Sequence, residues 1–160
     1  MGKKIKTTCH ICTQVIKAEE APSSCTRCGA NLVNTAEETV TKQSQGQYSK
    51  GKLGGEMGYF YLTNKRLVWI RNGTTGTGAL VGGLVGALVE TAVNKAAGGN
   101  KLGFSLDLTN IKSVEDGKFG LLVKAIIINT KDGESYKIGP KKLADWKETL
   151  SGYASYGSNL

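Results

Sequence analysis

Apolar positions are spread unevenly along the 160 residues of the chain. Residues 1–50 carry few large apolar side chains, whereas the run 59–70, YFYLTNKRLVWI, is rich in aromatic and branched residues. The centre of this run, Thr63-Asn64-Lys65, is typical of a tight turn, so the run predicts two strands at 59–62 and 67–70. The main hydrophobic core is therefore expected in the second part of the chain.

Later segments continue the strand pattern. Four of them have strand composition, at 103–108, 111–115, 119–129 and 135–138, and a break near Lys124 is left open in the third. Asp116-Gly117 and Asp132-Gly133 favour hairpin turns, because glycine adopts a positive φ without steric penalty. Consecutive strands joined by tight turns pair antiparallel, so these segments predict an antiparallel meander.

The last element expected is a helix at 141–150, opened by Pro140. Leu143, Trp146 and Leu150 recur at helical spacing and share one face that can pack on a sheet. The expected fold is α+β and mostly β: an antiparallel β-sandwich or split barrel, capped at one end by this C-terminal helix.

Four cysteines form two Cys-x2-Cys pairs separated by twelve residues: Cys9, Cys12, Cys25 and Cys28. Two residues between thiols let one tight turn direct both sulfurs at the same ion, and two such turns complete a tetrahedron that leaves no position for water. Gly29 can supply the left-handed conformation that such a turn needs. A segment this poor in apolar residues also needs a staple to fold. The pattern predicts a ribbon at 1–34 held by one structural Zn²⁺.

His10 lies inside the first cysteine pair. Four thiols already fill the coordination shell, so we expect this histidine to be a solvated loop residue rather than a ligand. The basic residues at 1–6 lead into no apolar run, and we expect no signal peptide. Paired cysteines without export favour metal over disulfides and place the protein in the cytoplasm.

Residues 35–55 are rich in Thr, Glu, Gln, Ser and Gly and show no hydrophobic period. This composition is typical of a flexible linker. Thr35-Ala-Glu-Glu resembles a weak helix start within it. The expected organisation is a ribbon at 1–34, a linker at 35–55 and a second domain at 56–160.

Both parts of the chain resemble known domains. Residues 7–33 resemble the short zinc ribbons at the start of many bacterial membrane-associated and regulatory proteins. The second part resembles GRAM and bacterial PH-like domains over 56–150 apart from one insertion, through YLTNKRLVWI at 61–70, DLTNIKSVE at 107–115, residues 126–129, Lys131-Asp-Gly-Glu and the Trp146 helix. This resemblance implies a PH superfold without enzymatic activity, in a family whose members bind membrane lipids or dock proteins.

The insertion, at about 76–99, predicts a glycine-rich apolar helix. Its small and large residues fall in separate stripes, Gly78, Gly82 and Gly86 on one and Leu80, Leu84 and Leu88 on another. Glycine stripes allow helices to approach closely, as in a glycine zipper, and a helix that is apolar all round needs cover. Residues 79–89 are too short for the roughly 20 residues of a membrane span. Two interpretations remain: an interfacial or re-entrant membrane segment, or packing on its own domain or on another copy.

The formal charge is +8, from 21 basic and 13 acidic residues, and it favours acidic partners such as membrane phosphates or nucleic acid. Lys65 and Arg66 in the first hairpin, and Lys141 and Lys142 at the final helix, are candidate lipid- or anion-binding residues. The alternative is that the hairpin pair forms a good turn, with Arg66 paired across strands, and that the other two are solvated.

Catalytic patterns are missing from the sequence. The single histidine lies beside cysteines, and GTTGTG at 73–78 lacks the Lys-Ser/Thr ending of a phosphate loop. We expect no catalysis and no small-molecule substrate.

The preferred hypothesis is a bacterial-type adaptor, peripheral at the inner face of the membrane. It would bind an acidic membrane surface or a protein partner and self-associate through the glycine stripe. The alternative is a zinc-ribbon nucleic-acid-binding protein that oligomerises through its second domain. A third hypothesis is a purely structural homo-oligomer in which the charge serves only solubility.

Overall fold

The computed structural model describes residues 3–50, 55–71 and 102–156. A small antiparallel sheet comes first, formed by β1 (Ile5–Thr8) and β2 (Val15–Ala18). The strands of a larger sheet follow: β3 (Val40–Ser49), β4 (Glu56–Thr63), β5 (Arg66–Arg71), β6 (Leu102–Asp107), β7 (Ile111–Phe119), β8 (Val123–Thr130) and β9 (Ser135–Pro140). A 3-10 helix, η1 (Leu108–Asn110), joins β6 to β7, and α3 (Leu143–Tyr156) follows β9.

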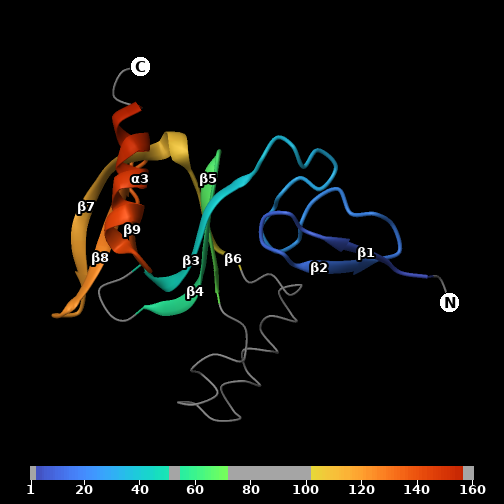
Figure 1. Ribbon diagram of the computed structural model, residues 1–160, viewed down its shortest axis with the longest axis horizontal. Helices are drawn as coiled ribbons and strands as arrows, with labels where there is room; N and C mark the ends of the chain where they lie inside the picture. The colour runs from blue at the N-terminus through green and yellow to red at the C-terminus, as the bar shows by residue number, and fades with distance from the viewer. Residues whose placement is uncertain (1–2, 51–54, 72–101, 157–160) are drawn as a thin grey trace, which may run out of the picture.

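The larger sheet has seven strands in the order β6-β5-β4-β3-β9-β8-β7, and neighbouring strands are antiparallel. Figure 1 shows this sheet curling around α3, which lies on its concave side. Trp146 and Leu150 of the helix are buried in a core with inward-facing residues of the sheet, among them Phe60, Trp69 and Ile126. The expected mostly-β fold with a C-terminal helix is confirmed.

The hairpin of β4 and β5 is buried on both faces. Phe60 and Trp69 point into the main core, whereas the alternate residues Tyr61, Val68 and Ile70 belong to a second cluster on the outer face. The ribbon supplies the rest of that second cluster. This arrangement explains why the sequence shows a continuous apolar run here instead of the alternation of a sheet with one solvated face.

The expected linker at 35–55 needs correction, because residues 40–49 form β3 at the centre of the sheet. Hydrogen bonds to β4 on one edge and β9 on the other hold this strand, so it needs few apolar side chains. Gly46, which suggested flexibility, allows close packing: a Cβ there would lie 2.4 Å from the carbonyl oxygen of Gly139. Residues 35–37 form a turn and bend rather than a helix start.

The hairpin between β7 and β8 also differs from the expectation. Gly117 lies inside β7, paired with Ala125, and the chain reverses at residues 120–122 instead. Gly120 takes the positive φ of this turn, 59°. Leu121 and Leu122 look like strand interior in sequence, which is why the sequence left a break open only near Lys124, two residues after the observed turn. The other expected turn is confirmed, with Gly133 at φ 89° between β8 and β9.

The C-terminal helix begins two residues later than expected and extends to Tyr156. The expected glycine-rich helix at 76–99 lies outside the described residues. Among the residues that the structure does describe, no helix is both long and apolar enough to cross a membrane.

Candidate metal centre and binding surfaces

Two equivalent backbone turns hold the four cysteines. Cys9 donates its N–H to the carbonyl of Gln14 and accepts at its own carbonyl from the N–H of Thr13, with N···O distances of 2.9 and 3.0 Å. Cys25 repeats this pattern with Ala30 and Gly29, at 2.8 Å for both. The residue four positions after each leading cysteine has a left-handed φ, 59° at Thr13 and 72° at Gly29. The glycine was expected there, and a threonine does the same in the first turn.

The two turns face each other and bring four sulfur atoms together. The Sγ atoms of Cys9, Cys12, Cys25 and Cys28 all lie within 4.8 Å of one another. The Cys9–Cys28 and Cys12–Cys25 distances are each 3.6 Å, and the four residues are at most 2% exposed. The backbone N–H of Arg27 points at the sulfur of Cys25, 3.4 Å away. The predicted ligands thus form one closed cluster that could hold a metal ion.

Four buried thiols this close together favour a bound cation. Burial raises the pKa of the Cys9 thiol to about 11. Contact with Cys12, together with burial, raises the pKa of Cys28 as well. A divalent ion reverses this preference, because coordination deprotonates a thiol outright. The cluster therefore fits a metal ion better than it fits four free thiols.

The metal centre rests on the outer face of the larger sheet. The four cysteines share their buried cluster with Tyr61, Val68 and Ile70 of β4 and β5. Arg66 joins the two parts by hydrogen bonds, donating from Nη1 to the carbonyl of Cys28 at 2.6 Å. Its Nε and Nη2 donate to the two carboxylate oxygens of Glu38, at 2.7 and 3.2 Å.

The Arg66–Glu38 pair is largely shielded from solvent, with side chains 18% and 12% exposed. Burial disfavours the ionised form of Glu38, but hydrogen bonds from Arg66 and Thr63 and the charge of Arg66 outweigh it, so its pKa is lowered. The backbone carbonyl of Glu38 also lies 3.0 Å from Nε2 of His10. His10 is therefore a half-buried bridge between the ribbon and the chain entering β3, which corrects the expectation of a solvated residue.

The four candidate anion-binding residues do not form one site. Arg66 is hydrogen-bonded to Glu38 and to the carbonyl of Cys28 within the protein. Lys65 lies at the β4–β5 turn, 3.8 Å from the carboxylate of Glu37. Lys141 and Lys142 are exposed between β9 and α3, where the N–H of Lys141 donates to Ser44 at 2.9 Å. The expected self-association residues, Gly78, Gly82, Gly86, Leu80, Leu84 and Leu88, lie outside the described residues.

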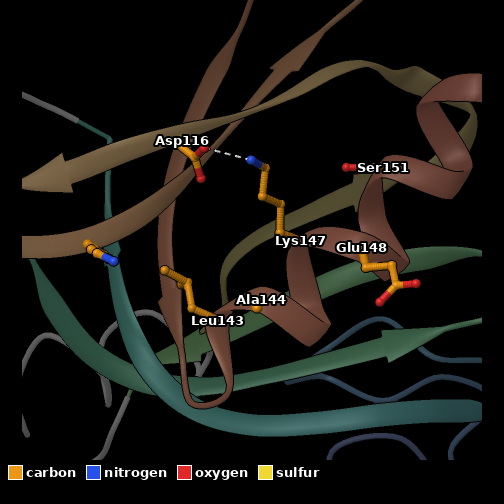
Figure 2. Close-up of a pocket in the computed structure, with 7 residues that line it drawn as sticks. Asp116, Leu143, Ala144, Lys147, Glu148 and Ser151 are labelled. Carbon is orange, nitrogen blue, oxygen red and sulfur yellow. Dashed lines mark hydrogen bonds and ion pairs between the residues drawn. The ribbon is translucent and has the colours of Figure 1, made fainter.

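A groove of about 570 Å³ runs between α3 and the β7–β8 hairpin. Figure 2 shows Leu143 and Ala144 at its base and Lys147 reaching across to Asp116, an ion pair of 2.7 Å. The Asp116 side chain is 82% exposed, so this pair contributes little to stability. The groove therefore offers an apolar surface bordered by solvated charges.

The turn of the β7–β8 hairpin is a surface that sequence reasoning missed. Leu121, Leu122 and Val123 are 88%, 90% and 57% exposed. The signal in the sequence is a glycine followed by three apolar residues between two lysines. It was read as part of a strand at 119–129, because apolar residues are rare in turns.

No model of a known protein family matches the sequence, and no curated protein matches it. Among solved structures, the chain is similar to the C-terminal domain of an unknown protein from Leishmania infantum, with 14% identity, a TM-score of 0.50, and coverage of 77% of this chain and 90% of that one. A mutant of the DH/PH domains of a RhoGEF is also similar, with 9% identity and a TM-score of 0.44, covering 81% of this chain and 33% of that one. At such identity the first likeness shows a shared fold alone.

Proposed function

We propose that the protein is a non-catalytic adaptor of the GRAM or PH-like type, in which a zinc-stapled ribbon and a curled sheet form one unit that binds an acidic membrane surface. One observation carries the proposal: the four-cysteine cluster is closed, buried and packed against the sheet. Cysteines placed in this way have a structural role, so the surface that meets a partner lies elsewhere on the protein.

Zinc is the ion that fits the cluster best. A zinc tetrahedron with Zn–S bonds of about 2.3 Å has sulfur–sulfur edges of about 3.8 Å. Two of the edges here are 3.6 Å and all are within 4.8 Å. Four sulfur ligands leave no open position for water or substrate, which is the arrangement of structural rather than catalytic zinc.

The charge supports an acidic partner. The formal charge is +8, and four thiolates on one Zn²⁺ change it by −4 and +2, to +6. Each basic residue near an anionic membrane contributes about 1 kcal/mol to binding. The six ion pairs of the described residues each join one basic and one acidic group, so they leave this excess unchanged.

The first experiment measures metal content and vesicle binding on the full chain. Elemental analysis is expected to find one zinc per chain, and none in a Cys12→Ser/Cys25→Ser variant. Co-sedimentation is expected with vesicles that contain phosphatidylserine and not with phosphatidylcholine alone, and added salt should weaken it.

Absence of binding to both vesicles would overturn the membrane part of the proposal. Salt-sensitive binding to DNA or RNA in its place would support the nucleic-acid alternative. A protein without bound zinc would overturn the structural role of the cysteines.

A further inference from the structure

The tip of the β7–β8 hairpin stands apart from the rest of the protein. The strands pair up to Phe119 opposite Val123, and residues 120–122 form the turn. A Cβ added to Gly120 would have no neighbour within 4 Å. In Figure 1 this hairpin ends at the side of the protein opposite the ribbon. The tip therefore projects freely into solvent.

The apolar residues of the tip do not stabilise the fold. Leu121 and Leu122 are about nine-tenths exposed, at 88% and 90%, so folding buries almost none of their surface. Phe119, one position before the turn, behaves in the opposite way. It is buried, and its ring would lie 2.7 Å from a Cβ at Gly139. The last strand residue before the turn is thus packed on β9, while Leu121 and Leu122 beyond it have almost no cover and Val123 is more than half exposed. In a folded protein such a run of exposed apolar residues indicates a binding surface.

Lysines surround this tip. Lys118 and Lys124 lie directly opposite each other on neighbouring strands, and like charges in this position destabilise a hairpin. Neither takes part in an ion pair with the described carboxylates. A third cation, Nζ of Lys137, lies 6.0 Å from the centre of the Phe119 ring. The arrangement has an apolar end and a basic collar behind it.

The depth of this arrangement matches a membrane interface. Two to three residues separate the lysine pair from the end of the turn, or about 7–10 Å at about 3.3 Å per residue. Apolar groups of interfacial proteins enter the boundary between headgroups and acyl chains by about 5–10 Å. When the leucines reach that boundary, the ammonium groups are level with the lipid phosphates. A free phosphate ion could contact the lysines but would leave the leucines exposed to water.

We propose that the β7–β8 tip inserts into anionic bilayers, with Leu121 and Leu122 in the acyl boundary and Lys118 and Lys124 at the headgroup phosphates. This inference rests on the proposed membrane function and names its site, which differs from the glycine-rich segment and from the basic residues chosen in the sequence.

The test uses the full zinc-loaded chain and vesicles of phosphatidylcholine with and without phosphatidylserine. A Leu121→Ser/Leu122→Ser variant is expected to weaken partition into the anionic vesicles by about tenfold or more, through loss of apolar burial. Lys118→Gln/Lys124→Gln is expected to weaken it by about fivefold per lysine at low salt. Val33→Ser is the matched control, because Val33 is 79% exposed but precedes β3 on the ribbon side. It should bind as the wild type does.

A Leu122→Trp variant reports depth. The native Trp69 and Trp146 are buried, so lipids brominated on their acyl chains are expected to quench only the added tryptophan. Quenching together with the loss in the serine variant supports the proposal. Undiminished binding of the serine variant would overturn the inference and leave the proposed function standing.

Two further results also count against the inference. No binding by the wild type would overturn the proposed function along with it. A dimer in solution that the serine variant abolishes, with unchanged vesicle binding, would assign the tip to a second copy and overturn the membrane occupant.

Discussion

The hairpins β4–β5 and β7–β8 both bear apolar side chains that lie outside the main core, but these side chains are buried on the first hairpin and exposed at the turn of the second. On the outer face of the first, Val68 and Ile70 are covered by the ribbon and its four cysteines. At the end of the second, Leu121 and Leu122 have no cover within the described protein. The four-cysteine ribbon thus buries one apolar surface of the sheet, whereas another apolar surface, at the β7–β8 turn, stays exposed and is the proposed membrane contact. Four predictions test that contrast, from the largest effect to the smallest.

Removing the metal should affect the first hairpin most. A strong chelator, or Cys12→Ser, is expected to lower the free energy of unfolding by about 4 kcal/mol or more, since an ion present at a thousand times its Kd contributes about that amount. Amide hydrogen exchange should then increase in β1, β2 and β5 and remain slow in α3. Unchanged exchange throughout would contradict a structural metal.

The same substitution in the two halves of the sheet compares covered with half-covered surface. Ile70→Ala opens a cavity beneath the ribbon and should destabilise the protein by about 2–5 kcal/mol. Ile127→Ala, on the half-buried face of β8, should cost about 1 kcal/mol, because less apolar surface is lost. Urea unfolding measures both values. Equal losses would show that the ribbon does not cover β5 in solution.

The ion pair between Glu38 and Arg66 should connect the ribbon to the sheet in a pH-dependent way. Glu38→Gln is expected to cost about 1–3 kcal/mol at neutral pH, through loss of charged hydrogen bonds. The pKa of Glu38 is lowered from its ordinary value of 4.5, so its contribution is complete above that value and is lost as the pH falls below it.

The difference in stability between wild type and this variant should therefore shrink on acidification below pH 4.5, measured by thermal unfolding. Metal loss at acid pH affects both proteins and largely cancels in the difference. A difference that stays constant with pH would contradict the ionic pair.

The smallest effect is expected at the exposed tip. Leu121→Ser/Leu122→Ser should change the free energy of unfolding by no more than about 0.5 kcal/mol, because both side chains are already in water. Thermal unfolding without vesicles measures this change. A loss as large as that of Ile70→Ala would mean that the tip is buried in the free protein.

Particular residues show how far local patterns reach. The cysteine spacing was enough to identify the metal-binding cluster, and the run 59–70 was enough to locate the first hairpin. Leu143, Trp146 and Leu150 were correctly predicted to face the sheet. Each of these signals is local: two thiols in one turn, alternating strands, or one face of a helix.

Three features escaped local reasoning. β3 was read as a linker, since its stability comes from backbone hydrogen bonds to β4 and β9 rather than from apolar side chains, and β9 lies far along the chain. Arg66 was considered for lipids or for pairing across strands; it is paired within the protein, but its partners Glu38 and Cys28, 28 and 38 residues away, were not foreseen. The tip residues 121–123 were read as strand, because apolar composition alone does not distinguish a buried position from an exposed one.

Local sequence patterns were sufficient to identify the four cysteines of the cluster, most of the strands and the C-terminal helix, and composition gives the excess of positive charge. Only the three-dimensional arrangement shows that the ribbon docks on β4 and β5 and that Arg66 is hydrogen-bonded to Glu38 and Cys28. It also shows that Leu121 and Leu122 stay exposed. The physical reason is the range of the interactions: turns, strand pattern and helix faces depend on neighbours in sequence, whereas burial depends on which distant segments the fold brings together.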